Sequence, residues 1–346
     1  MSEDRPQPEI SALNPFSDAF SRTGRLLFSP FNLRLWLGLG LCVFLAQLGH
    51  TAEGFQGFNY TFQPPAPRGP AGHPSGVLYE VVRFILDHWV LALFIGWIAV
   101  TLVLAVTAIL FWLSARGTFM MFDGLVHQRG NVIEPWRTFR DPADSLFVFN
   151  FCVWLIDVLN ILAIAGIGLF IALPDILAGQ FTGRSFLALS IGVPALLLSQ
   201  IAWLAVWFLT RHVVAPVMYR HRCDVLTGWS IAWRHLIAPH WLAIILFALL
   251  KAVIAVGIGI LEFVGTCLTC CIAALPYIGT VLLLPLYAFT WNYTLLFVGQ
   301  FPAVAPMFPQ RDERCPLCGY DRRYLPMGRP CPECGHVPPV EQTPAE

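Results

Sequence analysis

Long apolar segments are the feature that most constrains how this chain folds. A helix needs about 20 apolar residues to cross a bilayer. Only 12% of the 346 residues are charged, which is about half the share found in a typical soluble protein. We therefore expect an all-α integral membrane protein with six transmembrane helices. The predicted spans cover residues 31–49, 89–113, 146–173, 186–210, 241–263 and 277–300.

One apolar stretch does not fit a single span. Residues 263–301 carry no charge and are too many for one crossing, and Gly265 and Pro276 interrupt them. Residues 265–275 are too few to cross alone. Irregular backbone at membrane depth must be buried in protein or line a cavity. We therefore expect residues 265–275 to form an apolar turn or a re-entrant segment.

The basic residues indicate the orientation of the chain. With six spans, 17 of the 21 basic residues lie at the termini and in the loops after spans two and four, and only three lie on the other side. Loops rich in Lys and Arg stay in the cytoplasm. Both termini are therefore predicted to be cytoplasmic.

A short pattern precedes three of the predicted spans. Each copy has an arginine, four residues and a proline: Arg25/Pro30, Arg137/Pro142 and Arg234/Pro239. We interpret the pattern as three repeats, each with a cytoplasmic interfacial helix followed by a two-span hairpin. In the first repeat, Phe16, Phe20 and Leu27 share a helical face that would contact lipid. The alternative is that Arg and Pro are simply common where a helix meets the membrane surface.

Two CxxC motifs near the C-terminus predict a metal site. They read Cys315-Pro-Leu-Cys318-Gly and Cys331-Pro-Glu-Cys334-Gly. Four thiolates complete a closed tetrahedral zinc site, which is structural because no position is left for water. The glycine after each motif permits a positive φ, so that backbone N–H groups can point at sulfur. We expect one structural Zn²⁺; bound iron and an unmetallated tail are the alternatives.

These features divide the chain into five parts. They are an N-terminal segment with an interfacial helix (1–30), a six-span membrane domain (31–301), a linker (302–314), a zinc ribbon (315–336) and a disordered tail (337–346). The ribbon is too small to fold without its metal. Reduced thiols persist in the cytoplasm, which agrees with the predicted orientation. The net charge is zero, so nucleic acid is not an expected partner.

Two charged residues fall inside predicted spans. Asp157 lies in the third span and Lys251 in the fifth. Charges at mid-bilayer are costly and usually face a partner or a water-filled cavity. The repeat offset of 97 residues maps Lys251 onto position 154, which is one helical turn from Asp157. We expect these two side chains to approach each other, as an ion pair or as a solute- or proton-binding centre. Three polar residues could join them: Asn160, Gln200 and Asn292.

The motif CPLCGYD…CPECG resembles the short zinc ribbon at the ends of many uncharacterised bacterial proteins. The segments SPFNLRLWLGLGL, VVAPVMYRHR and LPYIGTVLLLPLYAF, together with ARGTFMMFDGLVHQRGNVIEPWRTFRDPADSLF, resemble multi-pass bacterial membrane proteins of unknown function. The resemblance implies a bacterial inner-membrane location. It also implies metal-ligand roles for Cys315, Cys318, Cys331 and Cys334.

No enzyme signature occurs in the sequence: GxSxG, HExxH, P-loop and Rossmann glycine patterns are all missing. The predicted function is therefore a non-enzymatic membrane protein with a cytoplasmic zinc ribbon that docks a protein partner or assists assembly. The alternative is a transporter or permease-like protein with a polar centre at Asp157 and Lys251.

Overall fold

The computed structural model describes residues 10–29, 31–53, 88–178, 182–268, 275–308, 315, 317–320 and 330–336. Within these ranges the chain is helical and forms no strand. Four helices are long and apolar enough to cross a membrane, so the prediction of six spans is confirmed only in part. They are α4 (Trp89–His127), α6 (Arg140–Ala178), α10 (Trp241–Leu268) and α7 (Gly183–Leu209), which continues through η2 (Thr210–Val214) and α8 (Ala215–His221).

The remaining two predicted spans have a different form. Helix α2 (Leu33–Glu53) has an apolar part that is shorter than the four long helices. The predicted span 277–300 is not one helix, because α11 (Pro276–Leu282) ends before α12 (Leu284–Val298) begins. Pro285 explains this break, since it lacks the N–H that would continue α11 and fits only the first turn of a new helix.

The structure also differs from the turn predicted at residues 265–275, in the part of that segment that it describes. Helix α10 continues through Leu268 instead of ending near Phe263. Residues 269–274 lie outside the described residues. The first part of the predicted turn is therefore helical.

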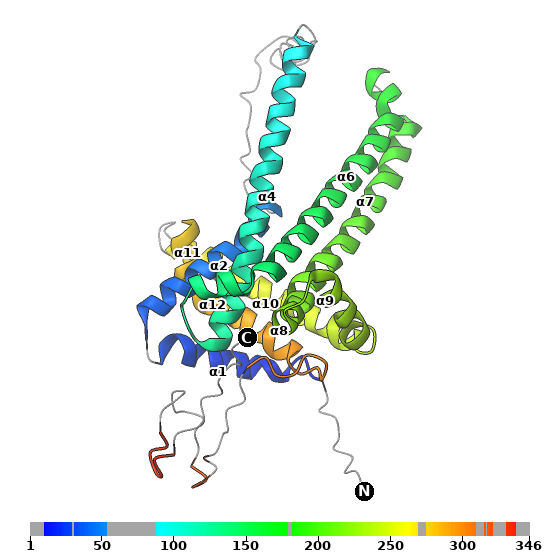
Figure 1. The fold of residues 1–346 in the computed structure, drawn as a ribbon. Helices are drawn as coiled ribbons and strands as arrows, with labels where there is room; N and C mark the ends of the chain where they lie inside the picture. Colours follow the sequence, from blue (N-terminus) through cyan, green and yellow to red (C-terminus); the bar gives the residue numbers. More distant parts are fainter. Residues whose placement is uncertain are drawn as a thin grey trace.

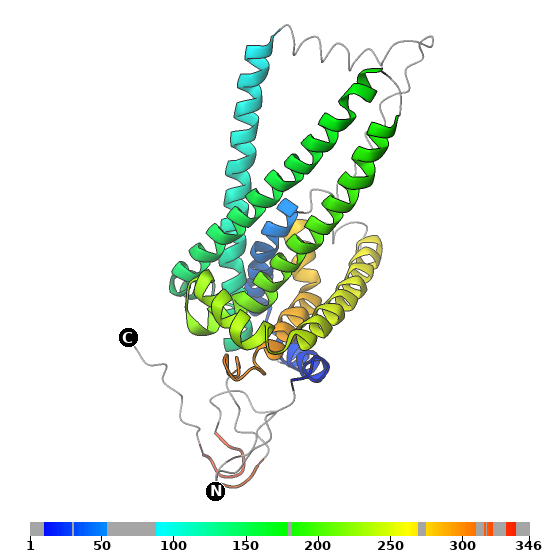
Figure 2. The same ribbon diagram turned by 90° about the vertical axis from the view of Figure 1, so that its right-hand side faces the viewer.

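The helices follow one another in three units of similar order. In each unit a helix at the base is followed by a helix that leaves the base of the molecule and by a helix that returns to it (Figures 1 and 2). The units are α1 (Asn14–Phe28) with α2 and α4, α5 (Ile133–Thr138) with α6 and α7, and the pair α9 (Val225–Ala232) and η3 (Trp233–Ile237) with α10 and α11–α12.

The hydrophobic core lies at the base, where the returning helices meet. Phe122 of α4 contacts Tyr219 of α8 and Trp291 of α12, with ring centroids 5.7 and 5.3 Å apart. Around these rings, Phe119 and Met218 are fully buried. In contrast, the outer parts of α4, α6 and α7 are apolar and exposed, and Figure 2 shows α6 and α7 extending together beyond the base. Helices that are apolar all round suit lipid, not water.

Helix α1 lies across the base and is part of this core (Figure 1). It packs against α12, where Tyr293 Oη donates a hydrogen bond to the carbonyl of Ala12 (2.9 Å). Phe20 is 72% exposed, as expected for a lipid-facing side chain, but Leu27 is fully buried. The expectation that Leu27 contacts lipid is therefore wrong: it lies on nearly the same side of α1 as Phe20, two turns further along, but there it is covered by the core.

Helices α2 and α4 pack closely because small residues line their contact. A Cβ atom added to Gly117 would lie 2.4 Å from the backbone nitrogen of Ala46. Beside it, Ser114 Oγ donates a hydrogen bond to the carbonyl of Ala46 (2.8 Å). Glycine and serine let two helix backbones approach each other in this way.

We expect Gly117→Ala to destabilise the protein by about 1–3 kcal/mol, because the added methyl overpacks the α2–α4 contact. The matched control is Gly166→Ala on α6, where an added Cβ has no atom within 4 Å. Unfolding in mixed micelles should separate the two variants. Equal stability would show that the close contact at Gly117 does not constrain the fold.

Candidate metal centre and buried polar groups

The two CxxC motifs form two turns of the same geometry. In the first, the N–H of Gly319 donates to the carbonyl of Cys315 (2.8 Å), and the N–H of Cys315 donates to the carbonyl of Tyr320 (2.8 Å). The second turn repeats both bonds with Gly335, Cys331 and His336. Gly319 and Gly335 have φ values of +74° and +73°, which confirms the role expected for the glycine after each motif.

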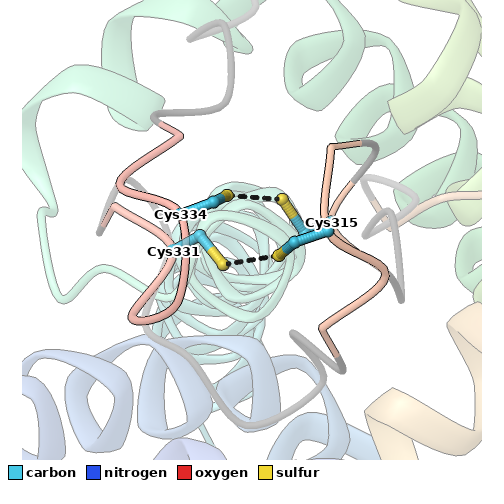
Figure 3. Close-up of side chains that lie close together, drawn as sticks. Cys315, Cys331 and Cys334 are labelled. Carbon is cyan, nitrogen blue, oxygen red and sulfur yellow. Dashed lines mark hydrogen bonds between the residues drawn. The ribbon is translucent and has the colours of Figure 1, made fainter.

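The four cysteine sulfurs of the two turns come together. They lie within 4.8 Å of one another, with Sγ–Sγ distances of 3.4 Å for Cys315–Cys334 and 3.5 Å for Cys318–Cys331. Figure 3 shows the sulfurs pointing toward one another across the gap between the turns. In a tetrahedral zinc site with Zn–S bonds of about 2.3 Å, the sulfurs would be about 3.8 Å apart. The cluster therefore has a suitable size for a metal ion held by four thiolates.

Backbone N–H donors favour the thiolate form of Cys315 and Cys331, the first cysteine of each motif. Burial raises the pKa of the Cys315 thiol, but N–H groups of Leu317 and Cys318 outweigh this effect and lower the pKa to about 6. At Cys331, N–H groups from its own turn likewise outweigh burial and lower the pKa of the thiol. Metal ions bind the thiolate. The turns thus favour the thiolate at Cys315 and Cys331, whereas the pKa values of the Cys318 and Cys334 thiols are raised, with hydrogen bonds to neighbouring cysteine sulfurs among the causes.

Loss of a residue that only supports a metal ligand typically weakens metal binding by roughly 10–100-fold. We expect Cys318→Ser to weaken metal binding by more than this, because it removes one of the four ligands. Metal analysis of the purified full-length chain should show about one ion per chain before the change and a clear loss after it. The control Cys152→Ser alters an exposed thiol of α6 and should retain the metal. Equal metal content in both variants would contradict the four-ligand site.

Asp157 and Lys251 do not form the pair that we expected. Asp157 Oδ1 accepts a hydrogen bond from Gln200 Nε2 of α7 (2.9 Å). Lys251 Nζ instead donates to Thr294 Oγ1 of α12 (3.0 Å). The reason is that Asp157 faces the other helix of its own hairpin, whereas Lys251 faces the third unit's returning helix.

The other two residues of the expected centre are also separate. Asn292 Nδ2 donates to Thr23 Oγ1 of α1 (3.0 Å). Asn160 Oδ1 is buried and accepts no hydrogen bond from any described residue. Of the five predicted residues, only Asp157 and Gln200 are therefore in direct contact.

Helix α10 carries a second charge, at Glu262, that was not among the expected polar residues. Glu262 lies 11 residues after Lys251, about three helical turns along the same face. Its carboxylate accepts a hydrogen bond from Tyr287 Oη of α12. A search for charged residues at helical spacing within the apolar segment would have found it.

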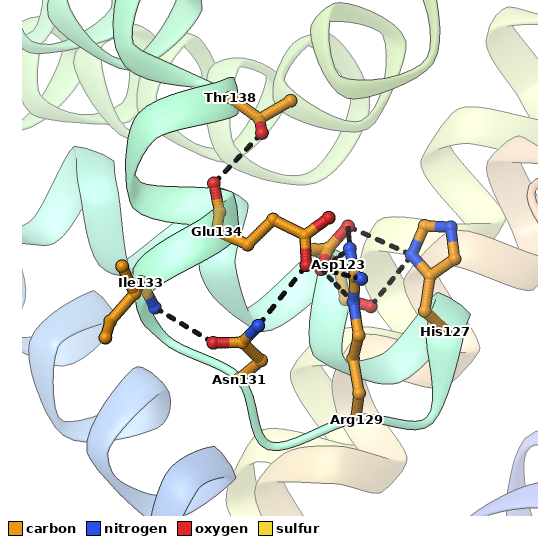
Figure 4. Close-up of polar contacts among 7 residues, drawn as sticks. All are labelled: Asp123, His127, Arg129, Asn131, Ile133, Glu134 and Thr138. Atoms are coloured by element: carbon orange, nitrogen blue, oxygen red, sulfur yellow. Dashed lines mark hydrogen bonds and ion pairs between the residues drawn. The ribbon is translucent and has the colours of Figure 1, made fainter. Parts of the chain in front are cut away.

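The turn between α4 and α5 holds a buried carboxylate that sequence reasoning did not single out. The Asp123 side chain is 3% exposed and contacts Arg129 (3.0 Å) and His127 Nδ1 (2.9 Å). Arg129 also pairs with Glu134 of α5 at 2.8 Å (Figure 4). These contacts close the turn that follows Gln128, whose φ is +55°.

Breaking a buried ion pair by removing one partner costs about 3–5 kcal/mol of stability. We expect Asp123→Asn to cost an amount near the lower end of this range, because the arginine of the pair is partly solvated. The matched change Glu134→Gln affects the same arginine from an exposed position and should cost at most about 1 kcal/mol. Denaturant unfolding in micelles measures both. The network would be structurally unimportant if Asp123→Asn cost no more than Glu134→Gln.

Comparison with known proteins identifies the helical part of the chain. A family model described as "Family of unknown function (DUF7544)" matches residues 10–308. The match covers all the described helices and ends before Cys315, the first residue of the cysteine cluster. No curated protein and no solved structure matches the chain.

Proposed function

The chain belongs to the DUF7544 family of unknown function, and we propose that it is a non-enzymatic membrane protein whose cysteine centre holds one structural Zn²⁺ and docks a cytoplasmic protein. The observation that carries this proposal is the closed arrangement of four sulfurs within 4.8 Å of one another. Such a set leaves no ligand position for water, so the site would stabilise a local structure instead of hydrolysing a substrate.

The docking role is supported by the form of the two turns. So few residues cannot bury a core of their own, and a metal would make them rigid. Leu317, near the tip of the first turn, is 71% exposed. An exposed apolar side chain on a rigid turn suits contact with another protein. The family match ends before these turns, so the docking role is argued from the turns themselves.

We place the centre on the cytoplasmic side of a bacterial inner membrane, because the distribution of basic residues predicts this orientation and because thiols stay reduced there. The four long apolar helices would cross the bilayer, and α2 and α11–α12 would complete six crossings. A transporter centred on Asp157 and Lys251 is not supported, since the two side chains contact different helices.

Photo-crosslinking in intact cells tests the docking role. With a photoreactive residue at position 317, we expect a crosslink to a cytoplasmic protein that disappears in Cys318→Ser, because loss of the metal loosens the turn. The control Cys152→Ser should keep the crosslink. A crosslink that survives Cys318→Ser, or labelling of the cluster by an impermeant thiol reagent from outside the cell, would overturn the proposal.

A further inference from the structure

Helices α6 and α7 leave a groove open between their outer halves. Its volume is about 480 Å³, within the range of about 300–1,000 Å³ that is usual for ligand sites. Figure 2 shows this part of the hairpin extending beyond the base. Half-buried residues from three consecutive turns of each helix form the floor of the groove: Ile164, Gly168 and Ala172 on α6, and Ala188, Gly192 and Leu196 on α7.

The glycines of this groove do not serve close helix packing. Glycine in a transmembrane helix usually lets a neighbouring helix approach. That is the case at Gly117, where an added Cβ would lie 2.4 Å from the backbone of α2. In contrast, a Cβ added to Gly168 or Gly192 would meet no atom within 4 Å. The small residues between α6 and α7 therefore leave apolar space for an occupant that the described part of the chain does not supply.

The length of the groove matches one leaflet of a bilayer. Its lining extends over eight positions of α6 and eleven of α7, which is about 12–17 Å at the rise of an α-helix. The hydrocarbon core of a bilayer is about 30 Å thick, so each leaflet contributes about 15 Å. The groove begins at Ser185, in the first turn of α7, and ends one turn before Gln200, which donates to Asp157. One acyl chain would fit along it.

A positive charge lies at the outer end of the groove. Arg184 is exposed, precedes the lining residue Ser185, and has no ion-pair or hydrogen-bond partner among the described residues. A cation in the first turn of a helix does not stabilise that helix. The acid at this end, Asp175, is buried and accepts hydrogen bonds from the N–H and the hydroxyl of Ser185 (2.9 Å each). Arg184 is therefore open to an anion, and its fork of N–H donors matches a phosphate.

We propose that the groove between α6 and α7 binds one acyl chain of an anionic phospholipid whose phosphate contacts Arg184. The lipid belongs to the leaflet that borders the outer end of the hairpin, on the side of the bilayer opposite to the base. This inference rests on the membrane placement proposed above, but it does not involve the cysteine centre.

The test uses the full-length chain in nanodiscs of phosphatidylcholine with a small share of phosphatidylglycerol that carries a photoreactive group midway along one acyl chain. After irradiation, mass spectrometry of the digested chain locates the attached lipid. We expect attachment at the groove to exceed attachment at residues 89–106 of α4, which are also apolar and exposed. Gly192→Leu fills the groove and should abolish this excess. The matched change Gly166→Leu lies on α6 outside the lining and should preserve it.

A second arm tests the headgroup contact. Arg184→Gln should lower the attachment of the phosphatidylglycerol probe at the groove about fivefold, the factor that corresponds to one arginine beside an anionic surface. Arg184→Lys keeps the charge and should retain most of the attachment. Equal attachment in Arg184→Gln and in the wild-type chain would overturn the proposal, because the phosphate would then have no role.

The remaining outcomes separate this proposal from the others. Equal attachment in Gly192→Leu and Gly166→Leu, or attachment at α4 but not at the groove, would overturn it alone. Attachment at none of these helices would also overturn the membrane placement. A dimer that Gly192→Leu separates, with no lipid at the groove, would assign the groove to a second copy of the chain.

Two further variants keep the test decisive. If Gly192→Leu does not fold, Ala188→Leu fills the same groove from the neighbouring turn and takes its place. Cys318→Ser should attach lipid as the wild-type chain does, because the cysteine turns lie outside the groove. A failure of the docking role would therefore leave the lipid result unchanged.

Discussion

The main hydrophobic core of the molecule is the packing of three returning helix ends at one base. In lipid, apolar side chains gain little by leaving the bilayer for one another, so helices associate through close packing and polar contacts. At the base, Phe122 meets Tyr219 and Trp291, while Gly117 brings α2 against α4. The outer parts of α4, α6 and α7 are apolar and exposed, and α6 and α7 are joined there by the hydrogen bond between Asp157 and Gln200.

The cysteine turns are stabilised in a different way. Each is closed by two backbone hydrogen bonds and by a glycine with positive φ, and among the residues that the structure describes the two turns meet through four sulfurs. These contacts are local and require no core. This explains how the turns can follow a helical domain whose family match ends before them.

Several features could be predicted from sequence because they depend on local chemistry. The spacing of Cys315, Cys318, Cys331 and Cys334 was enough to predict their approach, and the glycines their backbone conformation. The helical character of the long apolar segments was also predictable. Hydropathy alone could not show that Pro285 divides the last apolar stretch. It also could not show which neighbour Lys251 faces, since that depends on the rotation of α10 against α12.

The π-helical segment η2 gives the repeated units unequal chemistry. Arg116 and Arg211 each follow a tryptophan by four positions and are 95 residues apart, whereas Met121 and Met218 are 97 apart. A π-helical turn accommodates inserted residues without breaking the helix. Arg116 pairs with Asp144 at 2.7 Å, but its counterpart Arg211 is turned toward Trp291. One arginine is thus held by an ion pair beside its own helix, whereas the other lies over an aromatic ring of the core.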